Sequence, residues 1–212
     1  MTIQENTQAS KVWDLFIRFF HWTLVAAFII SYLTEGEYNL HFYSGWYIAI
    51  LLVSRIIWGL IGSKYARFSD FIKPPSDIIQ YVKSLMAGED DRKTYLGHNP
   101  LGGLMVVIMI TSLATTAFTG VLLYKTEGND TFAFLQQPVL QELDEEEDHE
   151  ENEHHEYKDE HEESELGEAL EELHEFFANL TLVLILFHVA GVFFTSRHEN
   201  RNLVKSMLTG KK

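Results

Sequence analysis

The sequence predicts an all-α integral membrane protein in which four transmembrane helices form a bundle. Two observations carry this prediction: four apolar runs of 23 to 25 residues, and an acidic block confined to the connection between the last two runs. Each run is long enough to cross a hydrocarbon core of about 30 Å, and helices satisfy the backbone in lipid. The runs are residues 12–34, 40–62, 100–124 and 174–196.

The average composition hides this organisation. Residues 127–175 hold 21 of the 31 acidic residues but only one of the 16 lysines and arginines, so the rest of the chain is basic. The mean hydropathy of −0.06 therefore describes neither part. The chain has no cysteine, which excludes disulfides, iron–sulfur clusters and covalent attachment of haem through a Cys-x-x-Cys-His motif.

The first apolar run contains Asp14 and Arg18 and lacks a small-residue cleavage pattern, so it predicts a membrane span and not a signal peptide. The second and third runs are joined by residues 63–98. Within this loop, "PPSDIIQYVKSLMAG" predicts a short amphipathic helix on the cytoplasmic membrane face, capped by Ser76 and ended by Gly88.

Lysine and arginine are concentrated in residues 63–98 and after residue 196, which predicts that both termini are cytoplasmic in a multi-pass protein of the bacterial inner membrane. The acidic, histidine-rich segment would then be a periplasmic insert between the third and fourth helices. Its final portion, "ESELGEALEELHEFF", is expected to extend the fourth helix outward. The predicted organisation is therefore helices one to three with the cytoplasmic loop (1–125), the insert (126–173), and the fourth helix with its tail (174–212).

Histidines occur in three of the apolar runs, where an ionisable residue indicates a functional site. His174 and His188 are fourteen residues apart, close to four turns, so they share one helix face about 21 Å apart. His21 lies at the depth of His188, and His41 lies at that of His174. Each could instead be a hydrogen-bonded packing residue, and His41 and His174 could be boundary residues. Together the two layers predict two haems b with two histidine ligands each, a coordination suited to electron transfer.

Arginine and glycine residues lie near these positions. Arg18 precedes His21 by three residues, and Arg55 follows His41 by fourteen, so each shares the face of its histidine. We interpret both as partners of haem propionates, with snorkelling to lipid headgroups as the alternative. Gly45, one turn after His41, would leave room for a flat macrocycle, although small residues also serve helix packing.

Several motifs together resemble the bacterial cytochrome b561 family: "RFFHW", "HFYSGW", "RIIWGLIGSKYARF", "GHNPLGGLMVV" and "LHEFFANLTLVLILFHVAG". This family includes the b-type cytochrome subunits of nickel–iron hydrogenases and, more distantly, the gamma subunits of formate dehydrogenases. The resemblance covers residues 11–125 and 170–205, whereas the acidic insert departs from it.

The resemblance implies a four-helix core with two haems b. It assigns His21 and His188 to the iron of the cytoplasmic-side haem, and His41 and His174 to that of the periplasmic-side haem. It also implies a quinone site near the cytoplasmic-side haem. His98 and Asn99, which directly precede the third run, are candidates for it, with a structural loop histidine as the alternative for His98.

These observations predict a membrane dihaem cytochrome b that transfers electrons between the quinone pool and a periplasmic c-type cytochrome, hydrogenase or dehydrogenase, as a subunit and not as a stand-alone enzyme. One alternative is a self-contained quinone reductase that uses a small oxidant such as superoxide. Another is a divalent-metal transporter with a histidine-rich loop, which the scarcity of carboxylates in the runs disfavours.

The acidic segment has three open interpretations: a solvated linker, a docking surface for a positively charged redox protein, or a site for a divalent metal. Its position next to His174 favours docking over metal binding. A homodimer remains open, and no nucleic-acid partner is expected. The candidate metal ligands are His149, His154, His155 and His161.

Overall fold

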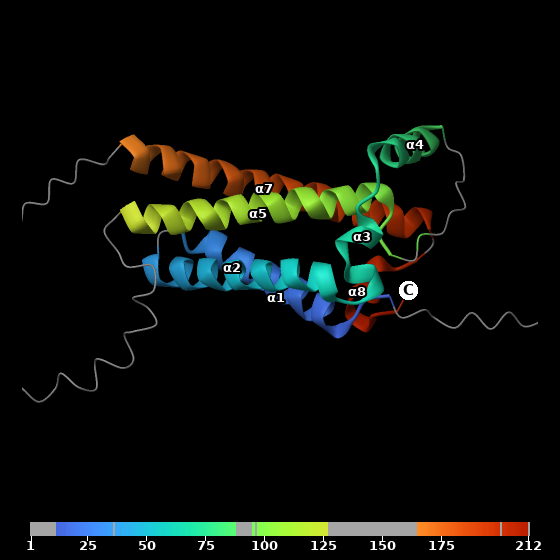
Figure 1. Ribbon diagram of the computed structural model, residues 1–212, viewed down its shortest axis with the longest axis horizontal. Helices are drawn as coiled ribbons and strands as arrows, with labels where there is room; N and C mark the ends of the chain where they lie inside the picture. Colours follow the sequence, from blue (N-terminus) through green and yellow to red (C-terminus); the bar gives the residue numbers. More distant parts are fainter. Residues whose placement is uncertain are drawn as a thin grey trace, which may run out of the picture.

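The computed structural model describes residues 12–35, 37–87, 95, 97–126, 165–199 and 201–211. Four long helices run side by side along the longest axis (Figure 1), and shorter helices gather at one end of this bundle. The long helices are α1 (Leu15–Leu33), α2 (Tyr38–Ile61), α5 (Pro100–Thr126) and α7 (Glu165–His198). The shorter elements are the 3-10 turn η1 (Lys64–Ala66), α3 (Phe68–Phe71), α4 (Pro75–Met86) and α8 (Leu203–Thr209).

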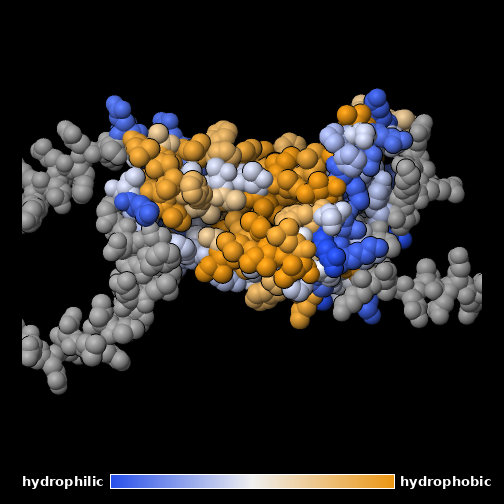
Figure 2. Space-filling view, viewed as in Figure 1, coloured by the Kyte–Doolittle hydropathy of each residue, from blue (hydrophilic) through white to orange (hydrophobic). Residues whose placement is uncertain are grey.

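The four long helices confirm the four predicted membrane spans. Each is long and apolar enough to cross a membrane, and each coincides with one of the four apolar runs. On the face shown in Figure 2, apolar side chains form a broad band across the middle of the molecule, while polar residues gather at both ends. Many large apolar side chains face outward, as Phe187 does with 64% of its surface exposed. This pattern is typical of a bundle whose outer surface contacts lipid.

We call the two ends of the bundle the α8 end and the Glu165 end. The α8 end holds α3, α4, α8 and the start of α1, and the Glu165 end holds the start of α7 and the turn between α1 and α2 (Figure 1). The basic segments 63–87 and 197–211 thus lie at the same end of the bundle. The charge pattern of the sequence predicted that these two segments lie on one side of the membrane, the cytoplasmic side.

The fourth span is longer than its apolar run. α7 is one continuous helix of 34 residues, about 51 Å long at 1.5 Å per residue, and it begins at Glu165. The expectation that "ESELGEALEELHEFF" extends the span is therefore confirmed from Glu165 onward. The other interpretations of the acidic segment concern residues 127–164, which lie outside the described residues.

The predicted amphipathic helix of the loop is present as α4, but its predicted cap was wrong. Pro74 occupies the N-cap position and Pro75 begins the helix, so Ser76 lies inside the first turn. Proline suits this position because its fixed φ is helical and its missing N–H would have no partner there. None of the residues of α4 is buried, and Ile79 and Met86 are exposed apolar residues. The predicted stop, Gly88, lies outside the described residues.

The bundle consists of two closely packed pairs. α1 packs along α2 and α5 packs along α7, and the pairs meet mainly where α2 crosses α5. A small cluster of buried side chains joins them at that crossing: Ala27, Ile48, Leu52 and Leu113. α7 meets the α1–α2 pair through side chains, among them the hydrogen bond from the Tyr32 hydroxyl to Asn179 at 3.1 Å.

Hydroxyl groups hold α5 against α7. The Oγ of Ser112 and the Oγ1 of Thr181 are 2.8 Å apart, and Ser112 also donates to the Phe177 carbonyl at 3.3 Å. Ser112 and Thr181 are 3% and 0% exposed. In an apolar environment such hydrogen bonds and small side chains determine how two helices pack and align.

The chain ends of the described region meet at the α8 end. The backbone N–H groups of Val12 and Trp13 donate to the Gly210 carbonyl at 2.9 and 3.2 Å. Gly210 has a φ of +80° and ends α8 in the left-handed conformation. A Cβ atom at this position would lie 2.7 Å from the Trp13 carbonyl oxygen, so both the conformation and the contact require glycine.

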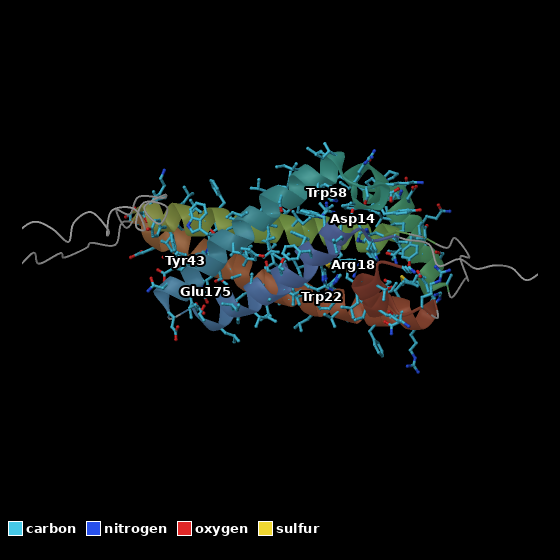
Figure 3. All side chains as sticks on the ribbon, turned by 90° about the horizontal axis from the view of Figure 1, so that it is seen from below. Asp14, Arg18, Trp22, Tyr43, Trp58 and Glu175 are labelled. Atoms are coloured by element: carbon cyan, nitrogen blue, oxygen red, sulfur yellow. The ribbon has the colours of Figure 1, made fainter. Side chains whose placement is uncertain are left out.

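Asp14 joins three segments at the α8 end. One carboxylate oxygen accepts the Ile17 N–H at 2.8 Å and caps α1, while the other accepts from Trp58 at 3.0 Å and from the Ser63 hydroxyl. Asp14 and Trp58 lie close together in Figure 3. Burial alone would raise the pKa of the Asp14 carboxyl, but the hydrogen bonds from Ser63, Ile17 and Trp58 outweigh it and lower that pKa below 3.8.

Asp14→Ala is expected to destabilise the bundle by about 1–3 kcal/mol, because a cap and two further hydrogen bonds are lost together. Since the folded-state pKa is depressed, the ionised carboxyl contributes fully at neutral pH, and its contribution is lost as the pH falls below 3.8. In detergent, the melting temperature of Asp14→Ala should therefore be lower than that of the unmodified protein at pH 7, and this difference should become smaller below pH 3.8. Asp77→Ala, which removes an exposed carboxylate of α4, is the control; a deficit equal in both variants would contradict this role.

Candidate functional site

The four histidines predicted as ligands form two pairs at different levels of the bundle. At the α8 end, His21 of α1 faces His188 of α7 with ring centroids 6.5 Å apart and ring planes at 49°. At the Glu165 end, His41 of α2 faces His174 of α7 with centroids 6.0 Å apart and planes at 68°. The structure thus brings together the partners predicted from depth. It also places both histidines of α7 on the side that faces α1 and α2.

The separation of the rings is suited to a metal ion between them. An ion bonded to one nitrogen of each ring, with bonds of about 2 Å, holds the two ring centroids about 6.3 Å apart. Both observed separations lie near this value. Within the described residues, no group of three or more His, Asp or Glu side chains could hold a metal ion. A pair of imidazoles therefore fits haem, in which the macrocycle supplies the four other ligands of the iron.

The pair at the Glu165 end has a defined ring orientation. The Nδ1 of His41 lies 2.9 Å from the Ser31 carbonyl oxygen, and the Nδ1 of His174 lies 2.9 Å from the Thr116 carbonyl oxygen. A carbonyl oxygen only accepts hydrogen bonds, so each ring donates from Nδ1 and leaves Nε2 without a proton. This is the arrangement that metal-bound histidines usually show, because the second hydrogen bond orients the ring and makes it a stronger ligand.

The pair at the α8 end differs in this respect. The Nδ1 of His21 is buried and has no hydrogen-bond partner among the described residues. Its ring instead packs edge-on against Trp22, with centroids 5.1 Å apart. Trp22 is partly exposed on the outer surface of α1, near α7 in Figure 3. The two pairs are therefore alike in spacing but different in the hydrogen bonds that hold their rings.

Two glycines near the pairs face open space. A Cβ atom on Gly45, four residues after His41, or on Gly191, three residues after His188, would meet no atom within 4 Å. At Gly45, a half-buried position, such space inside a bundle is unusual because interiors are close-packed. This space fits the edge of a haem beside His41, as the sequence predicted for Gly45. Ser31, His41, Thr116 and His174 lie together at this level of the bundle, and His21 and His188 face each other at the other level.

Arg55 is buried at the α8 end without a hydrogen-bonding acceptor for its Nη1 atom among the described residues. Only 3% of its surface is exposed, and its guanidinium lies over Phe68 and Phe71, 5.4 and 5.7 Å from their ring centroids. The Asp14 carboxylate interacts favourably with the charge of Arg55, and the free Nη1 donor fits the carboxylate of a bound group, because a buried donor without an acceptor is unfavourable. Arg55 therefore stays a candidate for binding a propionate.

Arg18 has a different environment from the one predicted. It donates from Nη2 to the carbonyl of Leu208, near the C-terminal end of α8, while its buried Nε has no partner among the described residues. A cation at this end of a helix is favourable because the last carbonyls lack helical partners. Arg18 thus holds α8 against α1, and the propionate contact predicted for it stays a prediction.

The candidates for the quinone pocket, His98 and Asn99, lie where the loop enters α5. His98 packs between Trp13 and Phe71, with ring centroids 4.8 and 5.1 Å away. The Oδ1 of Asn99 accepts the Gly102 N–H at 2.6 Å, and its amide donates to the Tyr81 hydroxyl at 3.1 Å. Asn99 therefore links α4 to the first turn of α5. Both residues lie at the α8 end with Arg55, and their proposed role in quinone binding stays a prediction.

Of the residues on α5 that contact His174, the interpretation of the sequence missed Thr116 and Thr119. The carbonyl of Thr116, the hydroxyl of Thr119 at 3.3 Å and the bare backbone of Gly120 all lie against its ring. The signal is visible in "TSLATTAFTG", where hydroxyl residues recur four positions apart on an apolar helix. Repeated hydroxyl groups on one face of a membrane helix indicate a contact with a neighbouring helix.

Comparison with known proteins agrees with this geometry. The sequence pattern of the prokaryotic cytochrome b561 family matches residues 12–210. Over 101 residues, the chain is 31% identical to a protein of Azotobacter vinelandii described as a probable Ni/Fe-hydrogenase B-type cytochrome subunit, a match that covers 44% of this chain and 42% of that relative. No solved structure matches the chain. The chain therefore belongs to the prokaryotic cytochrome b561 family, which implies a membrane protein of electron transfer that binds haem b.

Proposed function

We propose that this chain is a dihaem cytochrome b that carries electrons across the membrane between the quinone pool and a redox protein on the opposite side. The observation that carries the proposal is the presence of two facing histidine pairs, each with a ring separation suited to iron, at two levels of one bundle. Haem supplies a one-electron redox couple when bound. Two histidine ligands leave no open position on the iron, which favours electron transfer over chemistry on a bound substrate.

The chain's own residues determine how each haem would be held. His41 and His174 present Nε2 because their Nδ1 atoms donate to backbone carbonyls, and Gly45 leaves room beside them. His21 and His188 would hold the other haem. Arg55 would bind a propionate of that haem, because it is 3% exposed and its Nη1 atom has no hydrogen-bond partner among the described residues. The apolar walls of the bundle keep water away from both sites.

The orientation in the membrane follows from charge. We place the α8 end in the cytoplasm because α3, α4, α8 and the segments beside them carry most of the lysine and arginine residues. The quinone would then react near His98 and Asn99, and the Glu165 end would face the periplasm of a bacterium.

A redox partner would dock at the Glu165 end, where it would lie nearest to His41 and His174. The first turns of α7 expose acidic side chains beside this pair, which attracts a positively charged surface and raises its rate of encounter. The described relative, a probable hydrogenase cytochrome subunit, makes a hydrogenase one candidate, together with a dehydrogenase or a c-type cytochrome.

The number of haems tests the proposal directly. The purified full-length chain is expected to contain two haems b per polypeptide, measured by extraction and absorption of the pyridine complex against protein concentration by amino-acid analysis. Redox titration should resolve two components, because the two ring pairs have different hydrogen bonds. A preparation that is fully loaded with added haem and still holds only one per chain would contradict the two-site proposal.

A further inference from the structure

The ring of His174 rests on a small surface of α5 that consists of Thr116, Thr119 and Gly120. Its Nδ1 lies 2.9 Å from the Thr116 carbonyl oxygen and 3.3 Å from the Thr119 hydroxyl oxygen. Thr119 is 2% exposed, and its hydroxyl lies 3.0 Å from the carbonyl oxygens of Thr115 and Thr116. When that hydroxyl donates its own proton to Thr115, a lone pair of the oxygen is left facing the Nδ1 proton.

Gly120 allows the ring to approach this closely. A Cβ atom at position 120 would lie 3.0 Å from Cε1 and 3.2 Å from Nδ1 of His174, so the ring would have to move by a few tenths of an ångström. The three residues thus define both the height and the rotation of the ring over α5. This surface, named here the His174 seat, consists of Thr116, Thr119 and Gly120.

The seat is aligned by the contact between Ser112 and Thr181. Thr119 lies seven residues after Ser112 on α5, and His174 lies seven residues before Thr181 on α7. In an antiparallel helix pair, equal steps of two turns bring the second pair of residues into contact when the first pair is aligned. The 2.8 Å contact of Ser112 with Thr181 therefore supports the register that places His174 over the seat.

We propose that Thr119 and Gly120 are positioning residues for the haem at the Glu165 end, and that the Thr119 hydroxyl gives the Nδ1 proton of His174 a second acceptor beside the Thr116 carbonyl. The inference rests on the proposed role of His174 as an iron ligand. A ring that donates from Nδ1 to two oxygens carries more electron density on Nε2. The ferric state of a haem bound there is thereby stabilised, and its midpoint potential is lowered.

The test uses three variants of the full-length protein, each purified with haem. Thr119→Val keeps the branched shape but removes the oxygen, Thr119→Ser keeps the hydroxyl, and Thr111→Val makes the same change at an exposed position of α5. Thr119→Val is expected to raise the midpoint potential of one haem and leave the other unchanged. The low-spin ferric EPR signal of the same haem should shift, and its release on dialysis should become about tenfold faster.

Thr119→Ser and Thr111→Val are expected to match the unmodified protein in all three measurements. Gly120→Ala is expected to lower the occupancy of the same haem, because the added methyl group displaces the ring. An unchanged or lowered potential in Thr119→Val, or equal shifts in both haems, would overturn the proposal.

One further variant separates this inference from the proposed function. If His174→Ala lacks one haem, and Thr119→Val leaves the properties of that same haem unchanged, only the role proposed for Thr119 and the seat is wrong. If His174→Ala retains both haems, the assignment of His174 as a ligand is wrong, and the inference about its seat falls with it.

Discussion

His188→Ala is expected to leave the protein with one haem in place of two. The substitution removes one ligand of the pair at the α8 end, and His21 alone would hold the iron weakly. The pair at the Glu165 end should be unaffected, because the rings of His41 and His174 donate to the carbonyls of Ser31 and Thr116, which lie away from His188. The absorbance of the reduced haem per polypeptide should fall by about half.

The chain offers a matched control for this experiment. His198 lies on the same helix ten residues later, is exposed, and stacks on Phe194 with centroids 6.1 Å apart. His198→Ala should therefore retain both haems. The reciprocal variant, His41→Ala, should lose the other haem, so that the two redox components can be assigned separately. Retention of both haems in His188→Ala would contradict the assignment of His188 as a ligand, as would loss of the same component in both variants.

Gly103→Ala is expected to be the most disruptive single methyl group added to the bundle, and Gly102→Ala, one residue earlier, should be nearly neutral. A Cβ atom at position 103 would lie 2.2 Å from the carbonyl oxygen of Phe71, a residue with no exposed surface. Because the Phe71 oxygen belongs to the backbone and a Cβ atom is fixed to the backbone of α5, α3 and α5 would have to separate. Overpacking of this kind costs about 1–3 kcal/mol and sometimes more.

At position 102 the nearest atom, 3.0 Å away, is the end of the Asn99 side chain, which can rotate. Alanine also stabilises a helix by up to about 1 kcal/mol relative to glycine. This gain offsets the disturbance of the hydrogen bond from the Gly102 N–H to Asn99 at the start of α5. Thermal unfolding in detergent should therefore separate the two variants by several degrees. Because Phe71 also contacts His98 and Arg55, Gly103→Ala should change the α8-end haem more than the other. Equal stability of the two variants would contradict the contact.

The four spans were predictable because each depends on local properties: length, apolar composition and the need to satisfy backbone groups in lipid. The pairing of the histidines was predictable as well, since helical periodicity and depth in the membrane are both functions of position in the sequence. The structure confirms that His21 faces His188 and that His41 faces His174. Their binding of iron stays a prediction.

Contacts that depend on segments far apart in the sequence could not be predicted in the same way. Arg18 was interpreted from its distance to His21, but its partner is a carbonyl of α8, 190 residues later. Ser76 has the chemistry of a helix cap, yet Pro74 and Pro75 determine where α4 begins. The contact of His174 with Thr116 depends on the register of α5 against α7, which Ser112 and Thr181 help to set. No periodicity in either helix alone specifies that register.

The continuity of α7 has a mechanical consequence. His174 and His188 lie on one uninterrupted helix, so a rotation of that helix about its axis turns both rings through the same angle. A force applied at Glu165, outside the apolar run, would therefore act on both sites as torque on a single rigid rod. Its packing against α5 and α8 and the hydrogen bond from the Tyr32 hydroxyl of α1 to Asn179 would oppose this rotation. A rotation of α7 would therefore change the ligand geometry at both levels of the bundle together.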